Sequence, residues 1–573
     1  MAIPTFYSYT QPANDEMTMP YNQSVSKTTA FYLTLTCALL CCVILFSFFR
    51  TAQAADVFSY LGGSEYDTAR SIAVDKDGNM YITGWTFTTD LPVTGNAIQS
   101  DHHGEADIFI ARVSADGHSV SMLTYFGGSG TDTAHDIAVD DAGNIYVTGT
   151  TNSADLMTVN PVQASLNGES DAFILKIDSS GVLTFASYFG GSGDETGQAL
   201  TVNSDGTITF AGNSRSTDLF TTADALDVSC GNDGLCDASD TSNADTRQSD
   251  AYLARFTLDS SDMYIPAYAT YVGGNSVDAA HDIAVDSNGV IYLTGETRSS
   301  DLVTRNALQS KLAGGFAGGY DAFVLALDPA QSTDKGLRYA SYLGGDGEDS
   351  GNAIAVASDG IVTLVGDTSS SGFPVTANAL QNKFFGGDAD AFITQVDTRA
   401  AGSASLLYSS YIGGDSDESG SAIAIDAQNN LYIAGYTTSD NFPTQQGPQL
   451  FYQDHGDGFL LKLNSDYSPG LASFVGGMSF DAAFAVAVDA SGMICLTGET
   501  ETTGLASGNA WQTAYSNHAD AYVTKIDPAA TPQKNTNANP GASGGSGDGG
   551  GGNINLWLNG LFLLAWFARN RRG

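Results

Sequence analysis

Basic residues are scarce in this 573-residue sequence, in which 22 lysines and arginines stand against 64 aspartates and glutamates. The formal net charge is −42. Nucleic-acid binding depends on Lys and Arg side chains that neutralise phosphates, so this balance argues against nucleic acid as a partner. An acidic balance of this size is typical of a soluble extracellular protein, or of one that meets divalent cations.

Cysteine is also rare, with six residues in the whole chain, so the fold does not depend on a disulfide framework. Three of the six lie in an apolar segment near the N-terminus. Cys495 stands alone in a strand-like run and is expected to be a buried small hydrophobe. Cys230 and Cys236 close a small loop in an Asp-rich insertion. They are the candidate disulfide, and a disulfide there fits an oxidising compartment.

Helical periodicity is missing as well. Residues 125–188 form one unit of a repeat and contain four β-type runs, at 136–140 (DIAVD), 145–150 (IYVTGT), 172–178 (AFILKID) and 183–188 (LTFASY). Gly, Asp, Asn or Ser bound each run, and no helical pattern intervenes, which predicts a four-stranded antiparallel meander. The runs are apolar at both alternating positions. Such a sheet must be covered on both faces, and a stack of identical sheets covers each face with the next copy.

An aromatic-x-Gly-Gly mark shows how often the unit recurs. The mark begins at Tyr60, Tyr125, Tyr188, Tyr271, Tyr342, Tyr411 and Phe474. Seven four-stranded units predict an all-β, seven-bladed β-propeller, with an open solenoid as the competing architecture. The seventh unit ends after its third strand at Asp527, while residues 56–60 match the missing fourth strand. The N-terminal strand is therefore expected to complete the last blade and close the ring, which a solenoid would not need.

These motifs carry a family resemblance. The pattern YxGG, then D-x-A-x-x-IAVD-x-x-GNIYVTG, then DAF-x-x-K-x-D resembles the SBBP bacterial β-propeller repeat, over about residues 57–527. The resemblance implies a seven-bladed propeller in a secreted or surface protein. It implies no defined reaction.

The N-terminal 54 residues are interpreted as a leader and signal peptide. Residues 29–49 form an uninterrupted apolar run preceded by Lys27. Ala52-Gln53-Ala54 is a small-x-small site, so cleavage is predicted between Ala54 and Ala55. The apolar run is also long enough to span a bilayer, and a retained anchor is the alternative. The predicted propeller then occupies residues 55–527.

The C-terminal end changes in composition. Residues 528–553 are a Gly, Ser and Asn-rich linker, and residues 554–573 are an apolar segment followed by an arginine cluster. This order resembles the GlyGly-CTERM type of bacterial sorting tail. The resemblance implies that a rhomboid-family protease cuts near the glycines and that the body reaches the cell surface or the medium. A plain tail anchor is the alternative. Either interpretation predicts an exported body that meets the membrane only through its terminal segments.

The two faces of the predicted ring differ in loop length. The first and second strands of a unit, and the third and fourth, are joined by tight hairpins such as residues 140–144 and 178–181. The opposite face carries the GG loops and the long connections between the second and third strands. Since binding residues concentrate on long loops held by a rigid scaffold, this long-loop face is the predicted functional face.

Carboxylates recur on the predicted long-loop face. Some lie in the GG loops, where Asp194 precedes Glu195, Glu348 precedes Asp349 and Asp417 precedes Glu418. The repeat-position carboxylates are Asp67, Asp132, Asp278, Asp349, Asp417 and Asp481 in the loops, and Asp107, Asp171, Asp250, Asp321, Asp390, Asp457 and Asp520 at the third strands. Asp caps turns, which favours a structural role, whereas carboxylate oxygens are also what Ca²⁺ binds.

The insertion at residues 227–249 offers a second calcium candidate. Asp233, Asp237, Asp240 and Asp245 could ligate Ca²⁺, braced by the cysteine pair, although the spacing is not that of an EF-hand. The alternative is an acidic solvated loop. Ca²⁺ is thus the one cofactor that the sequence raises.

No catalytic motif is present. The seven histidines form no H-E-x-x-H pair, and neither a G-x-S-x-G elbow nor a phosphate-binding G-x-x-x-x-G-K-[ST] loop occurs. His135 and His281 share one repeat position, which indicates a packing role. The sequence predicts a monomeric, non-catalytic exported propeller that binds a glycan, matrix polymer or protein. A calcium-dependent hydrolase or lyase and a surface-layer or spacer protein are the alternatives, and an unrepeated cluster of His, Arg, Lys or Tyr at the mouth of the ring would favour the enzyme.

Overall fold

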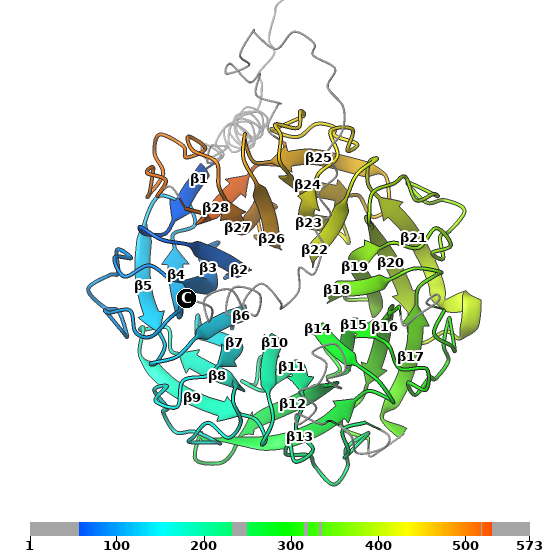
Figure 1. Cartoon of the computed structure of the whole chain (residues 1–573), viewed down its shortest axis with the longest axis horizontal. Coiled ribbons are helices and arrows are strands. Elements are labelled where there is room, and N and C mark those ends of the chain that lie inside the picture. Colours follow the sequence, from blue (N-terminus) through cyan, green and yellow to red (C-terminus); the bar gives the residue numbers. More distant parts are fainter. Residues whose placement is uncertain are drawn as a thin grey trace, which may run out of the picture. The chain divides into compact units, whose positions relative to one another are not determined.

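The chain folds into seven sheets of four antiparallel strands that follow one another around an axis (Figure 1). The structure, a computed structural model, describes residues 57–231, 236, 249–313, 319–331, 335–516 and 518–529. Each sheet is one blade, and strands that are consecutive in sequence are neighbours in the blade. The predicted all-β, seven-bladed propeller is confirmed.

The blades have closely similar strand lengths. Blade 1 comprises β2 (Asp67–Val74), β3 (Met80–Thr86), β4 (Asp107–Val113) and β5 (Val120–Phe126); blade 2 comprises β6 (Asp132–Val139), β7 (Ile145–Thr151), β8 (Asp171–Ile177) and β9 (Leu183–Phe189). Blade 3 comprises β10 (Glu195–Val202), β11 (Ile208–Ser214), β12 (Asp250–Leu258) and β13 (Tyr264–Val272); blade 4 comprises β14 (Asp278–Val285), β15 (Ile291–Thr297), β16 (Asp321–Leu327) and β17 (Leu337–Leu343). Blade 5 comprises β18 (Asp349–Val356), β19 (Ile361–Thr368), β20 (Asp390–Asp397) and, after the 3₁₀ turn η3 (Gly402–Ser405), β21 (Leu406–Ile412). Blade 6 comprises β22 (Glu418–Ile425), β23 (Leu431–Thr437), β24 (Asp457–Leu463) and β25 (Pro469–Val475). Blade 7 comprises β26 (Asp481–Val488), β27 (Ile494–Thr500), β28 (Asp520–Ile526) and β1 (Val57–Leu61).

The last blade combines the two ends of the ring. Its strand order is β1-β28-β27-β26, and β1 pairs antiparallel with β28 from Val57 opposite Lys525 to Leu61 opposite Ala521. Figure 1 shows the dark blue β1 beside the orange β28. The predicted closure by the N-terminal strand is therefore observed, and it excludes the open solenoid.

The hydrophobic core lies between blades rather than within one. Between blades 1 and 2, Tyr81 and Ile110 share a buried cluster with Val147 and Phe173. Equivalent clusters join every neighbouring pair of blades among the described residues, including blades 7 and 1. Strands that are apolar on both faces need a neighbour on each side, and the ring supplies one.

The short turns on one face of the ring are held by aspartate side chains. In blade 2 the carboxylate of Asp140 accepts hydrogen bonds from the backbone N–H of Ala142 (3.0 Å) and Asn144 (2.9 Å) and from the Tyr146 hydroxyl (3.0 Å). Gly143 has a φ of +81°, which a side chain would strain. The motif D-x-x-G-N thus encodes the turn itself, because its polar groups satisfy the backbone locally.

The tyrosine of the YxGG mark holds the long loop of its own blade. Tyr188 donates a hydrogen bond to the carbonyl of Ser153 (2.6 Å) and accepts one from the backbone N–H of Leu156 (3.0 Å). Equivalent pairs of bonds are made by Tyr60, Tyr125, Tyr271 and Tyr411. The mark therefore fixes the long-loop face as well as the junction between blades.

The predicted terminal segments lie outside the described residues. These are the leader with its cleavage position at Ala54 and Ala55, the linker at 528–553 and the apolar tail at 554–573. Within the part of the chain that the structure describes, we find no helix whose length and hydropathy suit a membrane span.

Candidate functional site

Two rings of carboxylates lie at the junctions between blades. The first residue of every inner strand is acidic and no more than 1% exposed: Asp67, Asp132, Glu195, Asp278, Asp349, Glu418 and Asp481. The first residue of every third strand is equally buried: Asp107, Asp171, Asp250, Asp321, Asp390, Asp457 and Asp520.

Each third-strand carboxylate lies close to the inner-strand carboxylate of the next blade. At the first junction, Asp107 accepts hydrogen bonds from the backbone N–H of His103 (2.8 Å) and from Gln99 Nε2 (2.9 Å). Asp132 accepts bonds from the backbone N–H of Gly128 (2.8 Å) and from Ser153 Oγ (2.8 Å). The two acids thus secure the loops on either side of the junction.

The first glycine of the YxGG mark lies between these two carboxylates. A Cβ atom on Gly127 would lie 2.3 Å from Asp107 Oδ1 and 3.0 Å from Asp132 Oδ2. Glycine is required here by space, because any side chain would collide with a buried acid. The same contact recurs at Gly62, Gly344, Gly413 and Gly476, each of which is flanked by the acids of its own junction.

Burial raises the pKa of these acids. Desolvation raises the pKa of Asp107 to about 7, and the nearby Asp132 contributes. Desolvation likewise raises the pKa of Asp67 to about 7, with a contribution from Asp520 across the closing junction. The pKa of Asp457 is also raised to about 7, by burial and by Asp481. Two carboxyl groups forced together in a dry site retain a proton near neutral pH.

The structure corrects one of the predicted repeat positions. In blade 6 the buried acid that begins β22 is Glu418, whereas Asp417 lies half-buried in the preceding loop and accepts a hydrogen bond from the backbone N–H of Asp388. Glu195 holds the same position in blade 3. A run of two adjacent acids leaves the register ambiguous by one residue, and in blades 3 and 6 the second acid of the run, a glutamate, is the one that enters the junction.

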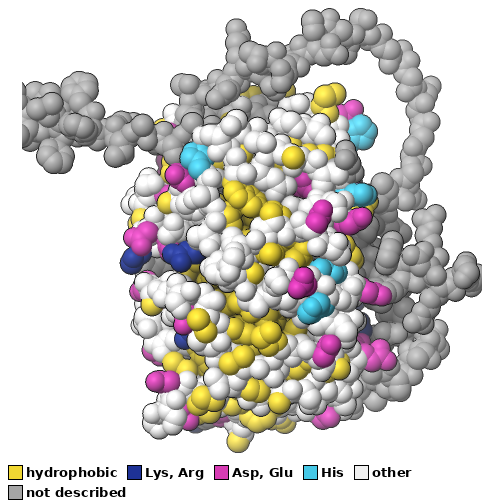
Figure 2. Space-filling view, turned by 90° about the vertical axis from the view of Figure 1, so that its left-hand side faces the viewer, with side chains coloured by type: hydrophobic (Ala, Val, Ile, Leu, Met, Phe, Trp, Pro, Cys, Tyr) yellow, Lys and Arg dark blue, Asp and Glu magenta, His cyan; other side chains and the backbone are white. Residues whose placement is uncertain are grey.

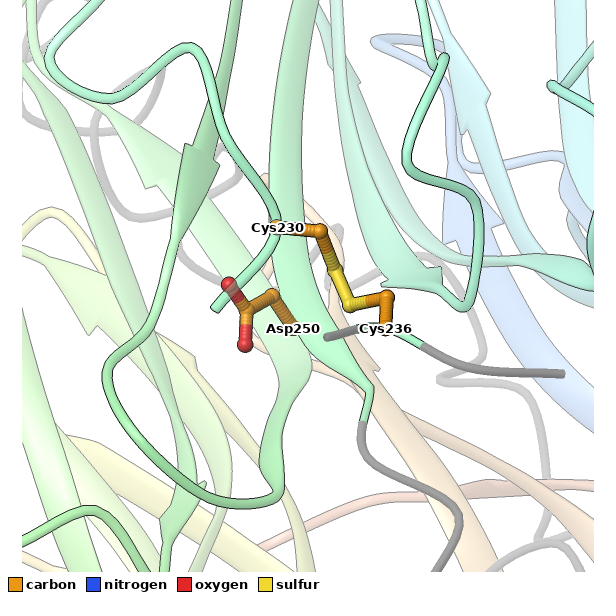
Figure 3. A group of neighbouring side chains, drawn as sticks. All are labelled: Cys230, Cys236 and Asp250. Carbon is orange, nitrogen blue, oxygen red and sulfur yellow. A yellow bond between two sulfur atoms is a disulfide. The ribbon is translucent and has the colours of Figure 1, made fainter. Parts of the chain in front are cut away.

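The candidate disulfide is present between Cys230 and Cys236, whose Cα atoms are 5.6 Å apart. Figure 3 shows the bond beside Asp250. In the described ranges, these three residues are the one group of three or more metal-ligating side chains whose ligand atoms lie within 4.8 Å of one another. The disulfide occupies two of those ligand atoms, and Asp250 is one of the seven junction acids. The predicted calcium ligands Asp233, Asp237, Asp240 and Asp245 lie outside the described residues.

Every inner strand carries a β-bulge at the same place. The register between inner and second strands shifts once in each blade, for example between Ala69 and Ser71 in blade 1. The extra residue is a different amino acid in most blades: Arg70, His135, Gln198, His281, Asn352, Ser421 and Phe484. Bulges re-aim side chains and are frequent at functional sites.

A second set of varied residues lies beside the bulges. It is the residue after the conserved glycine of each second strand: Trp85, Thr150, Asn213, Glu296, Asp367, Tyr436 and Glu499. Each is paired with the second residue of its inner strand, near the end that leads into the long-loop face, as Trp85 is with Thr68. We call these seven residues together with the seven bulged residues the axial ring.

One half of the axial ring, in blades 7, 1 and 2, is aromatic and cationic. The guanidinium carbon of Arg70 lies 4.7 Å from the ring centroid of Phe484 and 5.6 Å from that of Trp85. The His135 ring meets Trp85 edge-on, with centroids 6.4 Å apart. Glu499 accepts a hydrogen bond from Thr68 Oγ1 (2.9 Å).

The other half, in blades 4 to 6, is rich in carboxylates. Asp367 accepts hydrogen bonds from Asn352 Nδ2 (2.7 Å) and Ser419 Oγ (3.0 Å). Burial raises the pKa of Glu296 to about 7. Arg298 and Tyr320 lie at the ends of the long loop of blade 4, with the guanidinium carbon 5.5 Å from the ring centroid. The varied side chains thus form two separate groups, one around Arg70 in blades 7, 1 and 2 and one around Glu296 and Asp367 in blades 4 to 6.

The two histidines at the shared repeat position link neighbouring blades. His135 Nδ1 lies 2.8 Å from the carbonyl of Gly197 in blade 3, and His281 Nδ1 lies 3.2 Å from that of Gly351 in blade 5. Desolvation, with a smaller contribution from Arg70, lowers the pKa of His135 to about 4, so this ring stays neutral at physiological pH. Both rings sit at bulges, where they bond the next inner strand.

Sequence reasoning missed the axial ring. The repeat is most regular at IAVD and at the glycine of the second strand, and the varied residues lie two positions before the first and one position after the second. The axial ring could have been found from two columns of the repeat. One is the fourth residue of each inner strand, and the other is the residue between Gly and Thr or Ser in the second strand. These two columns change chemical type from blade to blade while their neighbours repeat.

Carboxylates are scattered over the side of the molecule that Figure 2 shows. In the side view of Figure 2, magenta carboxylates are spread over the surface, and few dark blue Lys or Arg side chains appear among them. This distribution agrees with the net charge of −42.

Comparisons with known proteins agree with the fold. The β-propeller repeat family SBBP matches residues 58–92, 123–156, 267–302 and 407–443. The regulatory protein FlaEY of Caulobacter vibrioides is 25% identical over 402 residues, which cover 66% of this chain and 39% of that protein. The chain thus spans well under half the length of this relative.

A gluconolactonase from Xanthomonas campestris is similar at 10% identity with a TM-score of 0.28, covering 61% of this chain and 77% of that one. This value is too low to bear on function. The first matched segment of the repeat family runs from the closing strand β1 through β3, so the sequence repeat straddles the junction between two blades. The chain is therefore a seven-bladed β-propeller in which four segments match the SBBP β-propeller repeat.

Proposed function

We propose that this chain is an exported, non-catalytic β-propeller that binds a glycan at its axial ring, on the side of the long loops. One observation carries the proposal. The junction acids, the YxGG tyrosines and the turn aspartates recur from blade to blade, whereas the axial ring varies in chemical type. Positions that the scaffold does not hold constant are available for recognition.

The residue types of the axial ring favour a glycan. Aromatic rings such as Trp85, and Tyr320 beside the axial ring near Glu296, offer flat apolar faces with polar edges. Carboxylates and amides such as Asp367 and Asn352 bond hydroxyl groups. Binding sites combine apolar lining with a few placed polar groups in this way. A matrix polymer of the same chemistry fits equally, and a protein partner is an outcome that the binding experiment distinguishes.

Export is part of the proposal. The disulfide between Cys230 and Cys236 suits an oxidising compartment. The acidic net charge favours solubility outside the cell. The predicted leader and sorting tail agree with this placement, and cleavage at either end is tested by sequencing the termini of the protein recovered from the native cell surface or medium.

A glycan-array screen of the full chain tests the proposal. Trp85→Ala and Tyr320→Ala should each weaken binding to any glycan found by at least about tenfold, because each removes a stacking face. Val182→Ala is the matched control, since Val182 is 56% exposed at a hairpin turn on the opposite face. Equal binding by all three variants would show that the axial ring is not the site. Binding only to proteins would replace the glycan with a protein partner.

Hydrolysis of a glycosidic bond is a second candidate function, favoured by the cluster in blades 4 to 6. Glycosidases need one carboxyl group that keeps its proton near neutral pH and a second that is ionised. Burial raises the pKa of Glu296 to about 7, which suits the acid. Burial raises the pKa of Asp367 as well, but the hydrogen bonds from Asn352 and Ser419 oppose that shift and favour its charged form. The Glu348 and Asp349 pair is not suitable, because Asp349 is a buried junction acid and Glu348 is exposed.

Release of reducing ends from a bound glycan tests this candidate. An enzyme would release them, and Glu296→Gln would abolish release while binding persists. Absence of release from every glycan that binds supports the non-catalytic function. Repeating the assay with EDTA and with added Ca²⁺ tests the predicted calcium dependence.

A further inference from the structure

Arg70 occupies an unusual place in this acidic protein. It is the extra residue of the bulge in β2, and its guanidinium group is half-buried between two aromatic rings from different blades, Phe484 and Trp85. Contacts of this kind hold the plane of a guanidinium group and leave its edges, which carry the N–H donors, to other partners.

The donors of Arg70 have no partner within the described part of the chain, where its guanidinium group makes neither a hydrogen bond nor an ion pair. Burial lowers the pKa of the Arg70 guanidinium group and is the larger effect. The negative charge of Glu499 acts in the opposite direction. Glu499 instead accepts its hydrogen bond from Thr68. No Arg70 nitrogen is among the buried, unpartnered atoms of the described residues, so these donors remain open to solvent and to a ligand.

Other cations of the molecule do have partners. Arg215, Arg338 and Lys525 form ion pairs of 3.2, 2.7 and 2.7 Å with aspartates. Arg112 is half-buried against the ring of Tyr81 at 5.4 Å, but Lys176 and Lys462 occupy the same repeat position and make the same kind of contact. Arg112 is therefore a repeated structural feature, and Arg70 is not.

We propose that Arg70 binds the carboxylate of an acidic glycan, of the uronic-acid type, at the axial ring. A guanidinium fork matches a planar carboxylate through two parallel hydrogen bonds, and Trp85 lies beside it as a stacking face for the sugar. The inference rests on the proposed function, because it names the ligand class of the same site. It adds that charge recognition, and not only stacking, selects the ligand.

Calorimetric titration of the full chain tests the inference with two probes of equal length, oligogalacturonate and its methyl ester. The acid should bind at least about tenfold more tightly than the ester, since only the acid carries the carboxylate. Arg70→Met should weaken binding of the acid by at least about tenfold and leave the ester unchanged. Arg70→Lys should fall between, because it keeps the charge and loses the fork. Arg112→Met is the matched control and should behave as the native protein.

Thermal melting shows whether Arg70 is instead a structural residue. If it serves a ligand, Arg70→Met should melt no lower than the native protein, because an unpaired cation is removed from a half-buried site. A lower melting temperature together with unchanged binding would assign Arg70 to packing and overturn the inference. Equal affinity for acid and ester, or no binding of the acid, would also overturn it. If Arg70→Met bound the acid as tightly as the native protein while Tyr320→Ala lost neutral-glycan binding, the proposed function would stand and only the inference would be refuted.

Discussion

The buried acids at the blade junctions place like charges side by side where water is excluded. Asp107 has one oxygen bonded to the His103 backbone N–H and to Gln99, while Oδ1 has no hydrogen-bond partner within the described residues and faces Gly127 and Asp132. Such a group is most stable when protonated. The junctions are therefore sensitive to proton concentration, although no junction acid belongs to the axial ring.

We expect Asp107→Asn to raise the melting temperature at pH 8. The amide keeps an oxygen for the bonds from Gln99 and His103 and turns its NH₂ group towards Asp132, so the repulsion between two carboxylates is lost. The gain should shrink as the pH falls below about 7 and be lost only near pH 4, because the pKa of Asp107 is about 7 in the folded state and about 3.9 in a free chain. Melting curves from pH 8 to about pH 4 measure this. Asp116→Asn, on a hairpin turn, is the control, and a lower melting temperature at pH 8 would contradict the expectation.

The Tyr188 hydroxyl is expected to contribute measurably to stability. Tyr188→Phe leaves the Ser153 carbonyl and the Leu156 N–H without their partner at a buried position, which should lower the free energy of unfolding by about 1–3 kcal/mol. Urea unfolding measures the change. Tyr66→Phe is the control, because Tyr66 is 52% exposed. An equal effect of the two substitutions would show that the hydroxyl does not hold the loop.

Single residues also show where sequence reasoning stops. The acid, the glycine and the tyrosine of each unit could be found from the repeat, but the partner of each acid could not. Asp107 meets Asp132 because the ring brings the start of one blade's third strand to the next blade's inner strand. That contact depends on how blades sit against each other, which no local pattern records. For the same reason the sequence does not show why the mark needs glycine, which is the narrow space between two carboxylates of different blades.

Among the structural elements, β28 holds the ring closed from both sides. It pairs with β1 on one edge and β27 on the other. Its Lys525 forms a buried ion pair of 2.7 Å with Asp489 and donates a hydrogen bond to the carbonyl of Ala115 in blade 1. Burial acts to raise the pKa of Asp489, but bonds from Lys525, Ser491 and the Met493 backbone outweigh it and hold that pKa below its usual value.

Lys525→Met should destabilise the protein by about 3–5 kcal/mol, since it leaves the Asp489 carboxylate buried without its cation. Unfolding in guanidinium chloride measures the loss. The double variant with Asp489→Asn should recover part of it. Lys76→Met is the control, because the Lys76 and Asp77 side chains of that ion pair are 65% and 68% exposed. An equally small effect at both lysines would mean that the closing ion pair adds nothing.

The elements were the most predictable level of the structure. The strands could be located because short apolar runs are separated by turn residues at regular spacing. The seventh unit lacks its fourth strand and residues 56–60 match that strand, which predicted β1 beside β28. The bulges were not predicted, because an extra residue in an inner strand leaves the hydrophobic pattern on both sides intact. The axial ring depends on those bulges, and so it was missed with them.

For the whole molecule, stability should pass through a maximum in mildly acidic solution. Burial raises the pKa of Asp67, Asp107, Asp390 and Asp457 to about 7. Between the unfolded value near 3.9 and about 7 the folded state binds more protons, so stability rises as the pH falls through this range. At still lower pH, the aspartates of the hairpin turns have the larger effect on stability. The pKa of Asp140 is held low by Asn144 and Tyr146 in spite of burial, and its stabilising effect is lost as protonation sets in.

Calorimetric melting from pH 8 to 3 tests this expectation. The melting temperature should increase from pH 8 to about pH 5 and fall again below about pH 4. Asp107→Asn should reduce the rise in melting temperature between pH 8 and about pH 5 and leave the fall below about pH 4 unchanged. Asp140→Asn should affect mainly that fall. A melting temperature that is constant between pH 8 and 5 would mean that the junction acids are ionised in the folded protein.

The closing strand has a consequence for how the molecule is made. About 460 residues separate β1 from its partner β28 in the chain. At roughly 5–20 residues per second, β1 leaves the ribosome between about 20 and 90 seconds before β28 exists. During that interval an apolar strand with open edges can pair with another chain as readily as with its own. The segment that seals the finished ring is thus the one that most needs shelter while the protein is being synthesised.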